Sequence, residues 1–459
     1  MTVDLAIIGA GPAGLAAATE ARALGLSVLL LDENPGPGGR IWQAIETRPA
    51  KDAADRAALA AVRAFRASGA EARFGATVWC VEPEGRVFWS EGGRAHVAKA
   101  EQTLIATGAI ERPLPIPGWT LPGVMTVGAA QIALKTGGLV PSDQVWLAGQ
   151  GPLLLLYAVQ ALAASGRIAG VLDLAPRGAF RRALAHLPRA LRAPSYLGRG
   201  IAWRLALRRA GIPWIRASRL RAEGEGRLER IRFVAAGEEH VRPAQILLLH
   251  DGVVPSVQMT RALGCAHCWD ESLRCWTPKT DPWGRSSLPR IVIAGDGAGI
   301  GGAAVAALSG RIAALGIAEA LGRLGAATRD SAAAPLIAAR ARHLAVRPFL
   351  NALFAPLPVE PEDDTILCRC EEVTAGRVRE AVALGCLGAN QLKAFTRAGM
   401  GPCQGRMCAA AVAAVIAAAR GVPEREIEPY RLRFPTKPLT LGELAALHDE
   451  AEAAALQAT

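Results

Sequence analysis

Continuous runs of apolar residues alternate along the chain with glycine-rich turns and with stretches whose apolar residues recur at helical spacing. Residues 3–8 form the first apolar run and predict a buried strand, and residues 15–24 predict a helix that Gly25 ends. Residues 27–31 predict a second strand, which is again almost entirely apolar. Strands without polar alternation are typical of parallel sheets that helices cover on both faces. The pattern therefore predicts a βαβ unit at the start of an α/β protein.

The turn between the first strand and the helix has the spacing of a dinucleotide-binding fingerprint. It reads Gly9-Ala10-Gly11-Pro12-Ala13-Gly14. The first glycine permits the tight turn, the second lets a pyrophosphate approach the backbone, and the third allows the helix to pack closely on the strand. An acidic residue at the end of the second strand can accept hydrogen bonds from a ribose. The candidate cofactor-binding residues of this unit are Gly9, Gly11, Pro12, Ala13, Gly14, Asp32 and Glu33.

Three later segments carry glycines or an acid at the ends of predicted strands. Glu33 is followed at a short distance by Gly38-Gly39-Arg40. Residues 103–106 lead into Thr107-Gly108, and residues 290–294 lead into Gly295-Asp296 and a Gly/Ala-rich helix. Together these segments resemble the marks of glutathione reductase-like flavoproteins, which implies FAD as the dinucleotide. In that class the matching aspartate accepts a hydrogen bond from the ribityl chain, although alone Asp296 would be interpreted as a helix N-cap. The resemblance adds Gly39, Arg40, Thr107, Gly108, Gly295 and Asp296 to the candidate FAD-binding residues.

A second βαβ unit is predicted in the middle of the chain. Residues 144–148 form a strand, Gly149-Gln150-Gly151 forms a turn, and a helix runs to about residue 165. Leu154 stands where the fingerprint has its third glycine, so close packing of helix on strand should be impaired. Two interpretations remain open, a second nucleotide site and a retained fold that has lost or changed its ligand. His250, at the end of a later apolar run, is either structural or part of a cleft.

The cysteines near the C-terminus give the most specific signal. Cys368, Cys370, Cys403 and Cys408 have the spacing C-x-C-x32-C-x4-C. Four thiolates in two close pairs suit a [2Fe–2S] cluster, whereas structural zinc usually takes C-x2–4-C pairs. Zinc and inert buried thiols remain as alternatives. Thr374 is expected to cap a helix over residues 375–384, and Cys408 to open a helix over residues 409–420.

Other cysteines carry weaker signals. The segment Cys265-Ala-His267-Cys268, with Cys275 beyond it, lacks a second comparable pair, so no metal or redox role is expected. No redox cysteine pair follows Gly39 or lies in the second βαβ unit, so disulfide reduction is not predicted.

Composition and charge narrow the function further. The 459 residues suit two or three domains, and the nine cysteines without a recognisable signal peptide favour a cytoplasmic protein. The longest apolar runs, 153–164 and 409–419, are too short to span a bilayer. A net charge of +11 would allow nucleic acid as a partner, but no nucleic-acid-binding motif accompanies it. The Arg- and Leu-rich residues 177–211 are either a docking surface for a partner or membrane, or a solvated helical face.

Over nearly its whole length the chain resembles the FAD- and [2Fe–2S]-containing subunits of amino-acid oxidase complexes: the A (alpha) chain of opine oxidases, the B chain of hydrogen cyanide synthase, and the alpha chain of dye-linked proline or hydroxyproline dehydrogenases. The resemblance rests on the first fingerprint, the Gly39-Arg40 turn, the degenerate second turn, residues 250–255 (HDGVVP), the Gly295-Asp296 turn and the cysteines. Residues 365–419 resemble the bacterioferritin-associated-ferredoxin-like [2Fe–2S] domain.

The resemblance implies a two-dinucleotide-binding-domain flavoprotein of the α/β class with a small helical C-terminal [2Fe–2S] domain. Its expected parts are an FAD domain (1–112 and 251–325), an inserted second nucleotide-binding-like domain (113–250), a linker (326–364), the [2Fe–2S] domain (365–425) and a tail (426–459). The implied partners are an FAD-containing beta subunit of D-amino-acid-oxidase-like fold and a small ferredoxin-like gamma subunit. ATP, NAD or FMN could occupy a second nucleotide site.

The predicted function is to carry electrons from the oxidation of an amino-acid-derived C–N bond, in the partner subunit, through flavin and cluster to an acceptor. The sequence shows no acid–base constellation of its own, which suits electron transfer. The predicted location is the cytoplasm, with peripheral attachment at the inner membrane left open. Two other functions remain: an NAD(P)H-dependent flavin and iron–sulfur reductase, and a scaffold protein whose cluster is structural.

Overall fold

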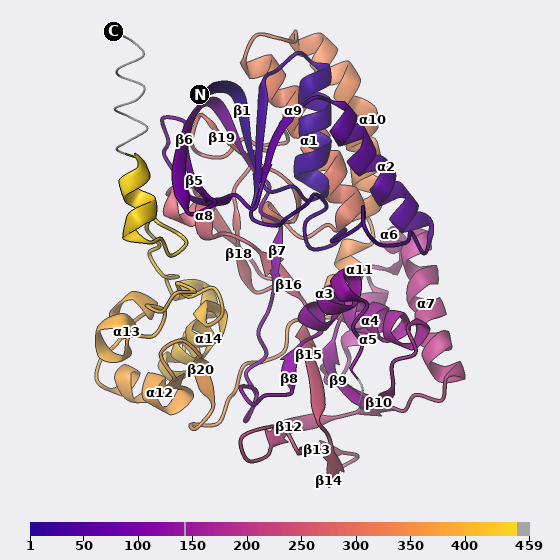
Figure 1. Ribbon diagram of the computed structural model, residues 1–459. Helices are drawn as coiled ribbons and strands as arrows, with labels where there is room; N and C mark the ends of the chain where they lie inside the picture. Colours follow the sequence, from indigo (N-terminus) through magenta and orange to yellow (C-terminus); the bar gives the residue numbers. More distant parts are fainter. Residues whose placement is uncertain (142–143, 448–459) are drawn as a thin grey trace.

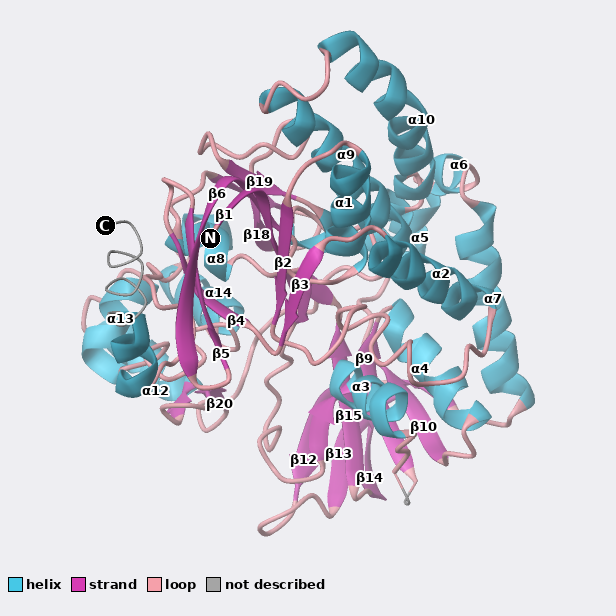
Figure 2. Ribbon diagram, turned by 45° about the horizontal axis from the view of Figure 1, so that its top comes forward, coloured by secondary structure: helices cyan, strands magenta, loops and turns pink. Residues whose placement is uncertain are grey.

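A computed structural model describes residues 1–141 and 144–447. Figures 1 and 2 show two α/β units, with a small helical unit beside the first of them. The first unit is built on a sheet with strand order β3-β2-β1-β6-β5-β4, in which β19 also pairs with β6. Its strands are β1 (Thr2–Ile8), β2 (Val28–Asp32), β3 (Glu71–Phe74), β4 (Thr77–Val81), β5 (Arg86–Glu91), β6 (Arg94–Ile105) and β19 (Ile291–Ile293).

The strands β3, β2, β1, β6 and β19 run parallel. Helices cover one apolar face of this sheet, and side chains of the antiparallel strands β4 and β5, such as Val81 and Val87, pack on the other face. The main helices are α1 (Pro12–Ala23), α2 (Ala53–Ala67), α9 (Ala303–Ala320) and α10 (Ala326–Leu344). The predicted strands 3–8 and 27–31 and the helix between them are confirmed by β1, β2 and α1. Helices α1 and α9 approach closely because α9 carries glycine at the contact: a Cβ on Gly310 would collide with the carbonyl of Ala13.

Helix α9 is the one described helix that is long and apolar enough to cross a membrane. In the structure it packs between α1 and α10, with residues such as Ile312 and Leu315 buried in the protein interior (Figure 1).

The second unit holds a five-stranded parallel sheet with the order β11-β10-β9-β15-β8. Its strands are β8 (Val124–Thr126), β9 (Val145–Gln150), β10 (Ile168–Asp173), β11 (Trp214–Arg216) and β15 (Ile246–Asp251). Its helices are α3 (Val127–Gly137), α4 (Pro152–Ala163), α5 (Ala179–Leu184), α6 (Leu187–Ala190) and α7 (Pro194–Arg209). The strands β12 (Ser218–Glu223), β13 (Arg230–Ala235) and β14 (Glu238–Pro243) form an antiparallel sheet at one end of this unit.

Two short antiparallel strands, β7 (Ala109–Glu111) and β16 (Val253–Pro255), join the two units. The chain then forms α8 (Gln258–Ala262), the hairpin of β17 (His267–Asp270) and β18 (Cys275–Pro278), and the short 3-10 helix η1 (Gly295–Gly297). The stretch 326–364, expected to be a linker, contains helix α10, which packs on α9, and α11 (Arg347–Leu353), which packs on α5.

The helical unit near the C-terminus has its own apolar core. Its elements are β20 (Ile366–Cys368), β21 (Val373–Thr374), α12 (Ala375–Ala383), α13 (Ala389–Thr396), α14 (Ala409–Arg420) and the 3-10 helix η2 (Glu424–Glu426). Thr374 caps α12 by accepting a hydrogen bond from the Arg377 amide, and Cys408 precedes α14, so both predicted helix starts are confirmed. The tail beyond η2 returns to the first sheet, where the Thr436 amide donates to the Trp79 carbonyl at 2.9 Å.

Candidate functional site

The first glycine turn lies at the wall of a cavity of about 1020 Å³ that extends from the first unit to the second. A Cβ on Gly14 would collide with the carbonyl of Gly9, so this position must be glycine for α1 to pack on β1. Gly11 differs, because no atom lies within 4 Å of a Cβ placed there. The cradle beside Gly11 is therefore open on the side where a pyrophosphate would approach. Of the predicted cofactor residues, those that line the cavity are Gly9, Gly11, Pro12, Ala13, Asp32, Glu33, Gly39, Arg40, Thr107, Gly108, Gly295 and Asp296.

The two neighbouring acids at the end of β2 have different surroundings. Asp32 is buried, and its carboxylate accepts hydrogen bonds from the Ala10 amide at 2.5 Å and the Asn34 amide at 2.7 Å. Its charge therefore holds the glycine turn and the following loop in place. Glu33 faces the cavity, where the Lys437 ammonium lies 2.6 Å from its carboxylate. Although burial acts in the opposite direction, Lys437 and Arg40 hold the pKa of Glu33 below its usual value.

At the other end of the expected FAD site, Asp296 fixes the loop that precedes α9. Its Oδ1 accepts hydrogen bonds from the amides of Gly301 and Gly302, both at 2.9 Å. Gly302 is the residue before α9, so this carboxylate organises the start of the helix while it also lines the cavity. Thr107 lies nearby, and its hydroxyl donates to the carbonyl of Ser256 at 3.3 Å.

The cysteine loop and the C-terminal tail contribute residues to the same cavity that were not predicted from the sequence. Arg406, Thr436 and Lys437 all line it. The Arg406 guanidinium donates to the carbonyl of Thr436, and Gln404 donates to the carbonyl of Pro435 at 2.8 Å, so the cysteine loop and the tail are held together. The cysteine unit thus forms part of the wall of the expected FAD site.

The structure brings the four predicted cluster cysteines together as two thiol pairs. Cys368 interacts with Cys408, and Cys370 interacts with Cys403. The partners in each pair come from opposite segments of the chain. No three His, Cys, Asp or Glu side chains of the described residues are arranged around one common metal position. A [2Fe–2S] cluster requires two protein ligands for each of its two irons, which four thiolates in two pairs can supply.

The surroundings of these thiols suit an anionic cluster. Cys368 and Cys408 are buried, Cys403 is partly buried and Cys370 is exposed. The hydrogen bond with Cys408 lowers the pKa of Cys368 to about 5, helped by the Gly399 amide at 3.5 Å from its sulfur. The same bond and burial raise the pKa of Cys408. Because the thiolate is the ligating form, an amide that points at sulfur favours cluster binding.

Glycines leave the space that this loop needs. A Cβ on Gly401 would collide with Cys370, and Cβ atoms on Gly399 and Gly405 would press against the ring of Tyr430. Tyr430 is buried, and its hydroxyl lies 3.9 Å from the Cys408 sulfur. The tail therefore covers the cysteines as well as the cavity.

The second glycine turn has a different backbone from the first. Gly151, which precedes α4, has φ +114°, whereas Gly11, which precedes α1, has φ −75°. Leu154 is buried in the core of the second unit, so α4 packs on its sheet through this side chain and the expected impairment is not seen. The His250 imidazole lies against Gly151, and its Nδ1 is 2.5 Å from Oε1 of Glu111. His250 therefore lines the cavity, paired with a glutamate that was not predicted.

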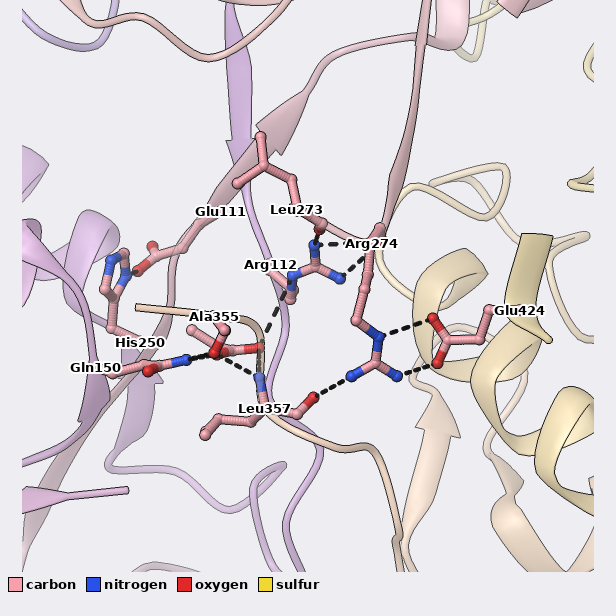
Figure 3. Close-up of polar contacts among 10 residues, drawn as sticks. Glu111, Arg112, Gln150, His250, Leu273, Arg274, Ala355, Leu357 and Glu424 are labelled. Atoms are coloured by element: carbon pink, nitrogen blue, oxygen red, sulfur yellow. Dashed lines mark hydrogen bonds and ion pairs between the residues drawn. The ribbon is translucent and has the colours of Figure 1, made fainter. Parts of the chain in front are cut away.

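A buried polar network lies beside this turn and links all three units (Figure 3). The Asp251 carboxylate accepts hydrogen bonds from the side-chain amide of Gln150 at 3.0 Å and from the backbone amide of Leu357 at 3.1 Å. The Arg112 guanidinium lies 3.8 Å from the same carboxylate. Burial raises the pKa of Asp251. Arg112 also donates to the carbonyl of Leu273, and Arg274 donates to Leu357 and pairs with Glu424 of the cysteine unit. The network holds residues 355–357, which follow α11, against strands β9 and β15 of the second sheet.

This network predicts a large effect on stability when Arg112 is lost. Arg112→Met leaves the Asp251 carboxylate buried without its cation, which is expected to lower the free energy of unfolding by about 3 kcal/mol. Thermal or urea unfolding measures this change. Asp251→Asn in the same chain should restore part of the loss, because it removes the buried charge. Equal, additive losses from the two substitutions would show that Arg112 and Asp251 are not coupled.

The segment around Cys265 forms no metal site in the described residues. His267 instead shares hydrogen bonds with the Thr260 hydroxyl at 3.0 Å and the Cys265 carbonyl at 2.7 Å. Burial lowers its pKa to about 4, so the ring is neutral at ordinary pH.

Profiles of two protein families match the chain. The pyridine nucleotide-disulphide oxidoreductase profile matches residues 3–310, and the BFD-like [2Fe-2S] binding domain profile matches residues 366–418. These matches confirm the two predicted cofactors, FAD and a [2Fe–2S] cluster, and the predicted fold class.

Full-length relatives are also found. The A chain of opine oxidase from Rhizobium meliloti (strain 1021) is 43% identical over 464 residues, which cover 97% of this chain and 98% of that protein. The HcnB chain of hydrogen cyanide synthase from Pseudomonas aeruginosa is 33% identical over 98% of this chain and 100% of that protein.

Among solved structures, L-proline dehydrogenase from P. horikoshii superposes with a TM-score of 0.71 over 97% of this chain and 79% of its own, at 20% identity. Thioredoxin reductase from T. acidophilum covers 69% of this chain and 98% of its own, with a TM-score of 0.51 and 20% identity. At this identity the two structures support the fold alone.

Proposed function

Because this chain belongs to the pyridine nucleotide-disulphide oxidoreductase family, in the group that contains the A chains of opine oxidases, we propose that it is the electron-transferring subunit of a hetero-oligomeric oxidase or dehydrogenase that acts on opines or related amino acids. It is an FAD-dependent, [2Fe–2S]-containing oxidoreductase subunit. The observation that carries the proposal is the placement of both cofactor regions in one chain, with residues of the cysteine loop and of the C-terminal tail in the wall of the cavity expected to hold FAD.

We assign the FAD residues as follows. Gly9, Gly11, Pro12 and Ala13 would cradle the pyrophosphate at the start of α1, where free amides and the helix dipole favour negative charge. Glu33 would accept hydrogen bonds from the ribose, and Asp32 would hold the turn rather than the cofactor. The cavity residues expected toward the flavin are Gly39, Arg40, Thr107, Gly108, Gly295 and Asp296.

The cluster would be held by Cys368, Cys370, Cys403 and Cys408. Bound FAD can take up a pair of electrons, and a [2Fe–2S] cluster passes them on singly. The chain itself supplies placement, burial and hydrogen bonds. No acid–base step is assigned to it, and the C–N oxidation would occur in the companion FAD-containing beta subunit of D-amino-acid-oxidase-like fold. A cytoplasmic location, free or peripheral at the inner membrane, stays a prediction, as does a small ferredoxin-like gamma subunit.

The second nucleotide fold does not favour direct reduction by NAD(P)H. Gln150 at the second turn is tied to Asp251 and to the carbonyl of Ala355, so the segment after α11 lies over the end of the strands where a nicotinamide nucleotide would bind. Nucleotide analysis of the purified protein tests whether ATP, NAD or FMN binds beside His250.

Co-expression of the chain with its companion subunit tests the proposed function. The purified complex should reduce an artificial dye when given opines, proline, hydroxyproline or glycine in a substrate panel, and its flavin and cluster should bleach anaerobically. Rapid bleaching of the flavin in this chain alone by NADH or NADPH would instead establish the reductase function. A cluster that no substrate and partner mixture reduces would favour a scaffold role.

Glu33→Gln tests the ribose assignment. The charged hydrogen bonds to the ribose would become neutral ones, which is expected to weaken FAD binding roughly tenfold. Reconstitution of the apoprotein with FAD, followed by flavin fluorescence, measures this change. Glu46→Gln is the matched control, because Glu46 pairs with Arg66 outside the cavity. Unchanged affinity in Glu33→Gln would remove Glu33 from the site.

A further inference from the structure

The excess positive charge of this chain is concentrated in one segment. Of the 52 Lys and Arg residues, 12 lie between residues 174 and 222, whereas none of the 41 Asp and Glu residues does. The rest of the chain therefore carries 40 cationic and 41 acidic residues and is almost neutral. A net charge of +11 is thus a property of a local surface rather than of the whole molecule.

Helices α5, α6 and α7 carry most of this charge on their exposed faces. Arg181, Arg189, Arg208 and Arg209 of these helices are exposed, as is Arg192 between α6 and α7. None of them forms an ion pair with a described residue. Elsewhere in the described chain, many arginines pair with Glu or Asp, as Arg311 pairs with Glu20. Among the residues that the structure describes, the arginines of α5–α7 have no such partners.

Large apolar side chains are exposed among these arginines. Phe180 is 60% exposed, Leu191 59% and Ile201 62%, and Leu184 and Leu205 are 42% and 43% exposed. Within α7, which has 16 residues, Leu207 is the one buried residue. Exposed apolar side chains of this size, gathered over neighbouring helices, mark interaction sites in soluble proteins.

The same helices adjoin the FAD cavity. Trp203 of α7 lines that cavity from the inside. Arg182, His186 and Arg189 line a second hollow together with Arg347 and Asn351, and these last two residues also line the large cavity. In Figures 1 and 2, α7 runs along the right edge of the molecule, whereas the cysteine unit with α12 and α13 lies on the left. A protein docked on α5–α7 would therefore reach the FAD cavity from the side opposite the cluster.

We propose that the exposed face of α5, α6 and α7 is the docking surface for a partner protein whose contacting face is acidic with apolar anchors. The proposal rests on the proposed function, in which that partner is the companion oxidase subunit. Arginine and aromatic side chains such as Phe180 are enriched in protein interfaces, and unpaired charges of one sign attract a surface of opposite charge. A membrane-surface helix needs its basic and apolar residues on opposite faces, but in α7 they are interleaved, as Ile201, Arg204, Leu205 and Arg208 show.

Charge reversal at Arg181, Arg189 and Arg192 tests the surface. These side chains are exposed, so Arg181→Glu/Arg189→Glu/Arg192→Glu should leave the fold intact. The association rate with the purified companion subunit, measured on an immobilised chain by surface plasmon resonance, is expected to fall at least about tenfold. Raising the KCl concentration should slow association of the unaltered chain but have little effect on the variant.

A triple reversal at Arg56, Arg63 and Arg94, which are exposed in other parts of the molecule, is the matched control and should associate normally. Undiminished association of the Arg181/Arg189/Arg192 variant would overturn the docking surface and leave the proposed function intact. Failure of the unaltered chain to form a complex would contradict both the proposed function and the docking surface.

Sedimentation with phosphatidylglycerol–phosphatidylcholine vesicles is a second experiment on the same variant. If the triple reversal abolishes vesicle binding but associates normally with the companion protein, the surface is a membrane site instead.

Discussion

Cys408→Ala is expected to abolish the [2Fe–2S] cluster while the FAD remains bound. The sulfur of Cys408 is buried at the start of α14, beside Cys368 and the hydroxyl of Tyr430. Without it one iron loses half of its protein ligands, and the other three cysteines of the site are already assigned as ligands. Iron content and the electron paramagnetic resonance signal of the dithionite-reduced protein should fall below about a tenth of the normal value.

Cys386→Ala is the matched control for this experiment. Cys386 is also a buried thiol of the same helical unit, but its sulfur donates to the Gly388 carbonyl at 3.4 Å and takes no part in the two thiol pairs. This variant should keep its iron and its signal. A normal cluster in Cys408→Ala, or an equal loss of iron in both variants, would contradict the assignment of Cys408 as a ligand.

The parts of the molecule that the sequence predicted well are encoded by residues close together in the chain. The first fingerprint occupies six consecutive positions between β1 and α1, and its steric demands are local, as the close approach of Gly14 to Gly9 shows. The cysteine spacing is likewise specific in itself. The helix starts at Thr374 and Cys408 followed from single capping positions.

What the sequence did not predict depends on contacts between distant segments. Lys437 reaches Glu33 across 404 positions, and no periodicity of the tail shows that it returns to the first sheet. Arg112 and Asp251, like Glu111 and His250, become partners only because β7 and β16 lie side by side. Such ion pairs depend on topology, which a single sequence does not display.

Helix α10 was missed for a different reason. It contains Pro335 inside the helix, and its composition of Ala and Arg gives no clear apolar stripe, so local rules favour a connecting segment. Packing of Ala333 and Leu336 against α9 stabilises it nonetheless. Tertiary contacts here outweigh the local preference.

Gly11→Val is expected to give a folded protein that does not retain FAD. Gly11 has φ −75°, which any residue can adopt, and no atom of the chain lies within 4 Å of a Cβ placed there. The added side chain would therefore project into the cavity, at the position where the pyrophosphate should approach the backbone, without disturbing the core. The loss of FAD affinity should be at least about a thousandfold, which is about 4 kcal/mol.

Two glycine variants separate this effect from general damage. Gly36→Ala, at a position with open space and outside the cavity lining, should bind FAD normally. Gly14→Ala should unfold at a lower temperature, because its Cβ collides with the Gly9 carbonyl. Flavin absorbance after desalting, together with circular dichroism of the apoprotein, distinguishes the outcomes. If Gly11→Val keeps its FAD, the pyrophosphate does not lie against this turn; if it loses both FAD and fold, Gly11 has a packing role that its empty surroundings do not explain.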